Sequence, residues 1–355
     1  MVAHDFGGNG KIEVMASFQG GITLFGGKNW EIKREVARFR DVYSGNRKKK
    51  SSCIHACLMD VDGDGDMDFI GSNQLVFWLE CPDKPFTQKW KFRVVDQEIL
   101  GIHCVTTGDI NRDGKIDLIA NSGSAKNTSF PQSIVWLESP SLGKINQPWI
   151  RHLIADRNAP GGSHCIGVGD VNHDGLPDFA CGAKGGEKFP DGECFVWWQQ
   201  PKESQSGWKK HLLSATQPGA SNILPADLDG DKNIDYFASR GHGQGVLLFK
   251  GPKFLKPVEI DPEIENPHSL ALADLDGDGD TDAVTCGSQL SGKVVSYEND
   301  GKANFTRHLI GKTRAVTIFG SWIWTETVIW IFSLPVTFAQ ILSGIKTPVF
   351  QKRFL

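Results

Sequence analysis

The chain has 355 residues, of which 39% are hydrophobic and 23% are charged, an ordinary globular composition with enough length for one large domain. Neither the formal net charge of −4 nor any motif indicates a nucleic-acid reader, a nucleotide-binding loop or a hydrolase triad. The eight cysteines form no Cys-x2-Cys pairs and fall mostly within predicted strands, which favours buried thiols, although an even count also permits disulfides.

The N-terminal segment is predicted to be an incomplete repeating unit. Asp5–Glu13 (DFGGNGKIE) is a degenerate copy of an acidic loop that recurs along the chain, with Gly7 where the other copies hold an oxygen ligand. The following segments, ITLFGG and WEIKREV, predict two of the later strands of this unit. No first strand is predicted before Asp5, and no charged-then-apolar secretion signal is recognised in the sequence.

Five acidic loops of nine residues share the pattern D-x-[DN]-x-D-x-x-x-D. They are DVDGDGDMD at Asp60–Asp68, DINRDGKID at Asp109–Asp117, DVNHDGLPD at Asp170–Asp178, DLDGDKNID at Asp227–Asp235 and DLDGDGDTD at Asp274–Asp282. Oxygen-bearing side chains at positions 1, 3, 5 and 9, with a backbone carbonyl at position 7, suit a hard cation such as Ca²⁺. Four of the five copies have Gly at position 6, where the chain must turn sharply. The remaining copy, Asp227–Asp235, has Lys232 there.

The residues at these five positions are the expected calcium ligands. They are Asp60, Asp62, Asp64, Asp66, Asp68, Asp109, Asn111, Asp113, Lys115, Asp117, Asp170, Asn172, Asp174, Leu176, Asp178, Asp227, Asp229, Asp231, Asn233, Asp235, Asp274, Asp276, Asp278, Asp280 and Asp282. The loops hold 20 of the 42 acidic residues and only three basic residues, so basic residues outnumber acidic ones in the rest of the chain. With cations bound, the protein is therefore expected to be mildly cationic, which favours anionic partners.

Each loop belongs to a longer repeat, because successive loops begin 47 to 61 residues apart. An apolar segment precedes each loop and a second follows it, as in SHCIGVG and FACGA around the third loop. A third segment closes on a polar residue: LVFWLE (Leu75–Glu80), SIVWLE (Ser133–Glu138), CFVWWQ (Cys194–Gln199), GVLLFK (Gly245–Lys250) and KVVSYE (Lys293–Glu298). A fourth segment, such as WKKHLL from Trp208, carries basic residues that are interpreted as protecting an exposed sheet edge.

Four short segments per repeat, rich in β-branched and aromatic residues, predict an all-β fold. The period of the repeat favours a β-propeller of six or seven four-stranded blades, with the acidic loop in the first hairpin of each blade. A solenoid is less consistent with the sequence, because solenoid repeats are usually shorter.

The five loops and the phrase VVSYENDGKANFTRHLI (Val294–Ile310) resemble the FG-GAP/VCBS repeat proteins of bacteria, and the loops also resemble those of integrin alpha-subunit propellers. The resemblance covers about residues 5–310. It implies a β-propeller, a calcium ion in the first hairpin of each blade and an extracytoplasmic location. It implies little about chemistry, because the same scaffold serves adhesion, carbohydrate binding and some lyases.

Histidines recur at the predicted starts of first strands, beside the expected central channel. His103, His164 and His268 each lie six residues before the first Asp of a loop. Either they cap the strands and hydrogen-bond to a neighbouring blade, or they converge on the channel mouth to hold a transition metal such as zinc. Loops predicted on the same face add Lys126, Lys184, Lys188, Arg240 and His242, which are expected to contact an anionic ligand.

Two functions follow from these alternatives. The first is an extracytoplasmic binding or scaffold module for an anionic carbohydrate or an extracellular protein. The second is a metal-assisted polysaccharide lyase or sugar dehydratase that acts on acidic sugars, so whether the protein is an enzyme stays open. Histidines that converge favour the enzyme, and histidines that point between blades favour the binding module.

Residues 1–310 are assigned to the propeller, with its N-terminal blade incomplete, and residues 311–355 to a hydrophobic tail. The tail has no charged residue between Thr327 and Ile345, close to the minimum length for a membrane helix. However, Pro335 and several β-prone segments disfavour such a helix. Three readings stay open: a seventh blade without a cation loop, a membrane anchor, or sequence foreign to the family.

Overall fold

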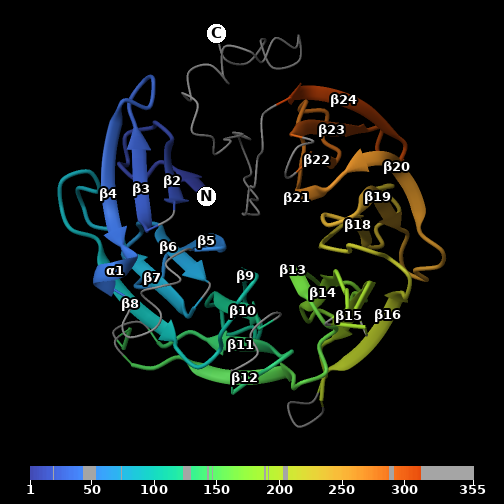
Figure 1. Ribbon diagram of the computed structural model, residues 1–355, viewed down its shortest axis with the longest axis horizontal. Helices are drawn as coiled ribbons and strands as arrows, with labels where there is room; N and C mark the ends of the chain where they lie inside the picture. The colour runs from blue at the N-terminus through green and yellow to red at the C-terminus, as the bar shows by residue number, and fades with distance from the viewer. Residues whose placement is uncertain are drawn as a thin grey trace. The chain divides into compact units, whose positions relative to one another are not determined.

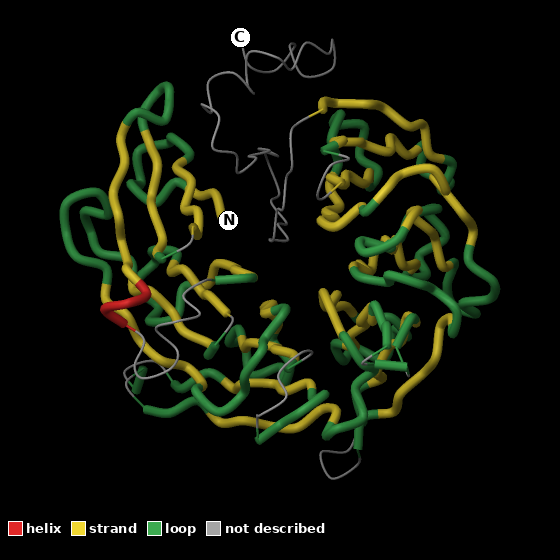
Figure 2. The backbone as a smooth tube through the Cα atoms, in the orientation of Figure 1, coloured by secondary structure: helices red, strands yellow, loops and turns green. Residues whose placement is uncertain are grey.

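The computed structural model describes residues 1–312, except for residues 19, 43–52, 73, 123–128, 142–143, 146, 188, 191, 203–206 and 288–291. The chain divides into two compact units, Met1–His164 and Cys165–Leu355. The described residues form six antiparallel sheets of four strands each (Figure 1). Figure 2 shows that strands and loops make up almost all of this part, which contains one short helix, α1 (Phe39–Val42). The described residues therefore form an all-β propeller of six four-stranded blades, and six is one of the two blade numbers that the repeat predicted.

The first unit contains blades 1 to 3. Blade 1 consists of β1 (Val2–His4), β2 (Glu13–Phe18), β3 (Gly21–Gly26) and β4 (Ile32–Arg38). Blade 2 consists of β5 (His55–Met59), β6 (Asp68–Ser72), β7 (Val76–Glu80) and β8 (Lys91–Asp96). Blade 3 consists of β9 (Val105–Gly108), β10 (Asp117–Asn121), β11 (Ile134–Glu138) and β12 (Ile150–Ala155).

Blades 4 to 6 follow. Blade 4 begins at the boundary of the two units and consists of β13 (Ser163–Gly169), β14 (Asp178–Ala183), β15 (Cys194–Gln199) and β16 (Lys209–Ser214). Blade 5 consists of β17 (Asn222–Ala226), β18 (Asp235–Ser239), β19 (Gln244–Phe249) and β20 (Val258–Glu265). Blade 6 consists of β21 (Pro267–Ala273), β22 (Asp282–Gly287), β23 (Lys293–Asn299) and β24 (Phe305–Lys312).

The expectation that no first strand precedes Asp5 is wrong. Val2–His4 forms β1, which pairs with β2 through the register Val2 opposite Met15 and His4 opposite Glu13. Val2 is fully buried. A strand of three residues is too short for its sequence to show an alternating pattern, and it forms here because β2 offers a free row of backbone hydrogen-bonding groups. Blade 1 therefore has all four of its strands.

The core of each unit consists of apolar side chains packed between neighbouring sheets. In the second unit, Phe195 of blade 4 and Tyr236 of blade 5 belong to one buried cluster. Phe237 of blade 5 and Tyr297 of blade 6 belong to another. The second strand of each of blades 2 to 6 is buried along its whole length and has a hydrogen-bonded strand on each side.

The basic residues of the outer strands join blades as well as marking an edge. In the first unit, the Arg151 guanidinium on β12 lies 2.6 Å from Asp96, at the end of β8 in the preceding blade. In the second unit, Arg307 on β24 lies 2.7 Å from Asp261 on β20. Each pair has a buried carboxylate, so these contacts help to hold adjacent blades together.

The hydrophobic tail lies almost entirely outside the described residues, since β24 ends at Lys312, two residues beyond the predicted limit of the propeller. The seventh-blade, anchor and foreign-sequence readings all concern residues 313–355, which are not described. Among the residues that are described, no helix has the length and apolar character needed to cross a membrane. The eight cysteines are all within the described residues, and none forms a disulfide.

Candidate metal-binding loops and histidine pairs

The five acidic loops all lie in the first hairpin of a blade, in blades 2 to 6. Each loop joins the first strand to the second, and its position-9 aspartate is the first residue of the second strand. The sequence therefore located the loops correctly within the blades. Whether the loops hold calcium is a separate matter, which depends on how their oxygen atoms are arranged.

The backbone of every loop turns through the left-handed region twice, at positions 4 and 6. In blade 6 these residues are Gly277 (φ 85°) and Gly279 (φ 100°). The N–H groups of both donate to Asp274, at 2.5 Å and 3.2 Å. Arg112 and His173 adopt φ values of 59° and 56° at position 4 of blades 3 and 4. The sequence identified the turn at position 6 but not at position 4, because bulky residues there hide a conformation that usually selects glycine.

The position-9 aspartates are buried and hold the hairpin together. In blade 6, Asp282 is 1% exposed and accepts a hydrogen bond from the Leu275 N–H at 2.8 Å. Its other oxygen accepts from the Asn299 N–H at 2.7 Å, just at the end of the third strand. In blade 2, Asp68 makes the equivalent bonds to the N–H groups of Val61 (3.0 Å) and Cys81 (2.7 Å). The position-9 carboxylate thus joins three parts of the blade.

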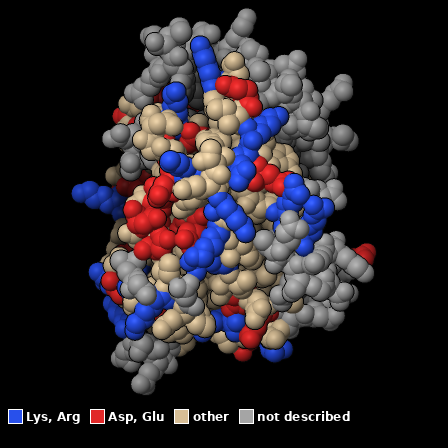
Figure 3. All heavy atoms as spheres, turned by 90° about the vertical axis from the view of Figure 1, so that its left-hand side faces the viewer, with Lys and Arg blue, Asp and Glu red and all other residues tan. Residues whose placement is uncertain are grey.

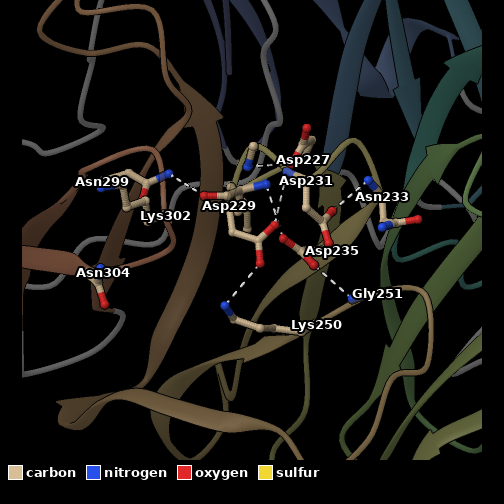
Figure 4. Close-up of polar contacts among 12 residues, drawn as sticks. Asp227, Asp229, Asp231, Asn233, Asp235, Lys250, Gly251, Asn299, Lys302 and Asn304 are labelled. Carbon is tan, nitrogen blue, oxygen red and sulfur yellow. Dashed lines mark hydrogen bonds and ion pairs between the residues drawn. The ribbon is translucent and has the colours of Figure 1, made fainter.

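In three loops the carboxylates of positions 1, 3 and 9 converge, each offering an oxygen within 4.8 Å of the others. These sets are Asp60, Asp62 and Asp68 in blade 2, Asp227, Asp229 and Asp235 in blade 5, and Asp274, Asp276 and Asp282 in blade 6. Figure 4 shows the blade 5 set, in which the side chains of Asp229 and Asp235 point toward one another. In blades 3 and 4 position 3 is an asparagine.

Burial and mutual repulsion disfavour the ionised state of these carboxyls. Burial raises the pKa of Asp68 to about 8 and the pKa of Asp178, Asp235 and Asp282 to about 6 each, and neighbouring loop carboxylates add to the rise. The pKa of Asp280 rises to about 6 through burial, followed by the charges of Asp278 and Asp282. A divalent cation would remove this penalty, because it attracts the ionised carboxylates.

Several loop oxygens are also buried without a hydrogen bond. Among the described residues, Oδ1 of Asp62, Oδ2 of Asp174 and Oδ1 of Asp280 accept none. Buried carboxylate oxygens normally accept hydrogen bonds or bind cations. The converging carboxylates, the raised pKa values and these three oxygens together make the loops fit a hard divalent cation.

The N-terminal loop keeps the same backbone but lacks one oxygen. Gly8 and Gly10 have φ values of 61° and 77°, and Asp5 accepts hydrogen bonds from the N–H groups of Asn9 and Gly10 at 2.9 Å and 2.6 Å. Gly7 at position 3 contributes no side chain, and its N–H donates to Glu13. This loop is therefore a hairpin of the same type, and we predict that it binds cations rarely.

The predicted histidine residues form two close pairs, one in each unit. In the first unit, the rings of His103 and His164 have centroids 3.8 Å apart. In the second unit, Nε2 of His268 lies 3.1 Å from Nε2 of His242. His55 instead approaches the Val105 N–H of the next blade through Nδ1, at 3.5 Å. The structure thus pairs His103 with His164 and His268 with His242.

Asparagines tie the same strand starts to the neighbouring blade, a role that the sequence did not reveal. In the first unit, the Asn121 side chain accepts hydrogen bonds from the N–H groups of His103 and Cys104 and donates to the His164 carbonyl at 2.5 Å. In the second unit, Asn222 donates to the His268 carbonyl at 2.9 Å. A single asparagine at a strand end has no spacing pattern that would mark this role.

The His242–His268 pair is neutral at physiological pH. Burial lowers the pKa of His268 to about 3, with smaller contributions from His242 and Lys184. Burial also lowers the pKa of His242 to about 4, and the Lys184 charge adds to this effect. Arg240, by contrast, is engaged in the framework, because its guanidinium pairs with Glu259 and donates to Gln217.

Two of the predicted ligand-binding lysines, Lys126 and Lys188, lie outside the described residues. Lys184 follows β14 directly and is half-buried. On the face shown in Figure 3, acidic side chains gather in one patch and lysine and arginine side chains lie around it. Both signs of charge therefore occur close together on this face.

The sequence matches the family described as FG-GAP-like repeat over residues 60–120, 170–238 and 227–285. Each match begins at the first aspartate of an acidic loop, and the chain is an FG-GAP-repeat β-propeller. No curated protein matches it by sequence.

Two solved structures share the fold at low sequence identity. One is an Agrocybe aegerita lectin described as specifically recognising non-reducing terminal N-acetylglucosamine, with a TM-score of 0.56 and 15% identity over 87% of this chain and 79% of the lectin chain. The other is described as BBS1N in complex with ARL6DN, with a TM-score of 0.50 and 11% identity over 89% of this chain and 82% of that chain. At these identities the likeness concerns the fold alone.

Proposed function

We propose that the protein is a calcium-stabilised binding module for an anionic carbohydrate, acting outside the cytoplasm. The observation that carries the calcium part is the convergence of the position 1, 3 and 9 carboxylates in blades 2, 5 and 6. In blade 6, Asp274, Asp276 and Asp282 would hold the ion together with the position-5 side chain and the position-7 carbonyl. A bound ion would supply positive charge to these converging carboxylates, of which the position-9 one is buried, and extracellular modules use sites of this kind at 10⁻⁴–10⁻³ M calcium.

Two observations support a carbohydrate ligand. The fold is shared with a lectin whose description names a terminal sugar as its ligand. Outside the acidic loops, basic residues outnumber acidic ones, so a calcium-loaded protein attracts anions. Among the described basic residues that were predicted to bind a ligand, we assign Lys184 to this role. It is half-buried, and its positive charge helps to lower the pKa of both His242 and His268.

Charge reversal at Lys184 tests this assignment. We expect Lys184→Glu to weaken the binding of uronate-containing oligosaccharides about tenfold, the equivalent of about 1.4 kcal/mol, because it replaces an attractive charge with a repulsive one. Rising salt should weaken binding to the wild-type protein, since exposed charges are screened over about 8–10 Å. Binding is measured by calorimetry in the presence of calcium.

Lys256→Glu is the matched control, because it makes the same charge change at an exposed lysine between β19 and β20. Its affinity should stay close to that of the wild-type protein. Equal effects of the two substitutions, or binding that is indifferent to salt, would contradict a ligand site at Lys184.

A second candidate function, a metal-assisted lyase or dehydratase of acidic sugars, is favoured by the His242–His268 pair. The two Nε2 atoms are 3.1 Å apart and both rings are neutral, which is the state in which imidazole binds metals. A bound transition metal would supply Lewis acidity toward a uronate carboxylate. His242 and His268 would hold this metal, and Lys184 would attract the acidic substrate.

Metal analysis of the purified protein separates the two candidates. If the protein is a metal-assisted enzyme, we expect about one zinc or similar ion per chain in addition to calcium. Both His242→Ala and His268→Ala should lose this ion. His211→Ala is the control, because His211 lies on the outer strand β16 and stacks on Trp197 with centroids 4.3 Å apart. Wild-type protein without a transition metal would leave the pair as a hydrogen bond between two neutral imidazoles.

A further inference from the structure

In each of the five loop-bearing blades, one residue near the end of the third strand occupies an equivalent position. It directly precedes the residue at that strand end whose N–H donates to the position-9 aspartate. These donors are Cys81, Ser139, Gln200, Gly251 and Asn299. The residues at this position are Glu80, Glu138, Gln199, Lys250 and Glu298. Blade 5 therefore has a positive charge where blades 2, 3 and 6 have a negative one.

The glutamates at this position pair with the outer strand of their own blade. Glu80 lies 2.6 Å from Arg93, Glu138 lies 2.7 Å from His152, and Glu298 lies 2.7 Å from His308. None of these contacts involves a ligand position of the loop. The glutamates thus leave the position 1, 3 and 9 carboxylates available and add to the negative charge around them.

Lys250 points instead at the loop itself. Its ammonium group lies 3.1 Å from Oδ2 of Asp229, the position-3 residue, and Figure 4 shows this contact beside Asp235 and Gly251. The Asp229 side chain is 18% exposed and the Lys250 side chain is 47% exposed. Asp229 belongs to the converging set with Asp227 and Asp235, so the ammonium group engages an oxygen that a divalent ion would need.

We propose that Lys250 is a built-in counter-ion that partly replaces the divalent cation in blade 5 and makes this loop the weakest calcium site among the three loops with converging carboxylates. This inference rests on the proposed calcium function. A calcium ion must displace the ammonium group from Asp229 or bind beside a like charge, and both lower its affinity. Lys232 at position 6 adds a second positive charge to the same loop.

Blade 3 has a superficially similar contact that differs in position. The Lys115 ammonium group lies 2.7 Å from Asp113, which is the position-5 residue, and both side chains are about one-third exposed. The ion pair of Lys115 is therefore with position 5 of its loop and not with position 1, 3 or 9. In blade 5 the lysine contacts the half-buried side of the loop, where the carboxylates converge.

Exchanging the lysine for the residue found in the other blades tests the inference. Calcium alone is titrated by calorimetry into the full chain for the wild type, Lys250→Glu and Lys250→Gln, the last matching Gln199 of blade 4. We expect Lys250→Glu to tighten the weakest site at least tenfold, or to add one bound ion per chain, and Lys250→Gln to tighten it less. Lys256→Glu, an equal charge change on the same blade, should alter affinity less than twofold.

The outcomes separate this inference from the calcium proposal. Wild-type protein that binds no calcium at any loop overturns both. Wild-type protein that binds calcium, with Lys250→Glu and Lys250→Gln unchanged in number and affinity of ions, overturns the role of Lys250 alone. If Lys250→Glu does not fold, Lys250→Gln decides the matter, because it removes the ammonium group without adding a charge.

Discussion

Chelation of calcium is expected to lower the melting temperature of the protein by about 10 °C or more. Each loop whose calcium is present at 100 times the dissociation constant contributes about 2.7 kcal/mol to stability, and several loops act together. For a chain of 355 residues, about 1–2 °C of melting temperature corresponds to each kcal/mol, so three occupied loops account for about 10 °C. Calcium should reverse the loss, whereas magnesium should reverse it poorly, because its smaller and stiffer coordination shell fits such loops badly.

The loss of melting temperature after chelation should depend on pH, and the raised pKa values determine the direction of this dependence. Asp178, Asp235 and Asp282 have a pKa of about 6 in the folded, cation-free protein and Asp68 has a pKa of about 8, against 3.8 as the ordinary value. A carboxyl that binds its proton more tightly when folded stabilises the fold fully below pH 3.8. That contribution is lost as the pH rises through the folded pKa. The calcium-free protein should therefore become less stable between pH 4 and pH 8.

Thermal unfolding followed by circular dichroism, at pH 5 and pH 8 with and without calcium, measures both effects. With saturating calcium, the melting temperature should change less between the two pH values, because the cation keeps the carboxylates ionised. A melting curve that stays the same after exhaustive chelation at pH 8 would show that the loops are not structural calcium sites.

The acidic loops were predictable from sequence because their fold depends on local spacing. A nine-residue segment with oxygen ligands at fixed positions encodes its own turn, and its place in the first hairpin follows from the strands on either side. The double role of position 9 was not predictable. Asp68 and Asp282 look like ordinary ligands in the sequence, yet each also accepts N–H groups from two segments that only the folded blade brings together.

The histidine pairs and Lys250 show a second limit of prediction from the sequence. The spacing of His103, His164 and His268 from their loops was regular, but spacing along the chain does not reveal that His268 faces His242, which comes from a different blade. In the same way, the third predicted segments end in Glu, Glu, Gln, Lys and Glu, so the exceptional Lys250 is visible in the sequence. Its contact with Asp229 requires the hairpin and the end of β19 to lie side by side.

The second large effect is expected from the position-9 aspartate of blade 6. Asp282→Ala should lower the free energy of unfolding by about 2–4 kcal/mol in saturating calcium, because the part-buried N–H group of Leu275 and the buried N–H group of Asn299 both lose their acceptor. Part of this loss should persist in the presence of a chelator, since the two hydrogen bonds do not depend on the cation. Urea denaturation under both conditions measures the difference.

Asp278→Ala is the matched comparison at position 5 of the same loop. Asp278 is exposed, and its side chain accepts a local hydrogen bond from the Asp280 N–H at 3.1 Å. Without calcium, this substitution should change stability by no more than about 0.5 kcal/mol, as is usual for a surface position. With calcium it should reduce stability, because a ligand is lost. If both variants were destabilised equally in the chelator, position 9 would have no structural role beyond that of the other ligands. If neither responded to calcium, the blade 6 loop would be a hydrogen-bonded turn and nothing more.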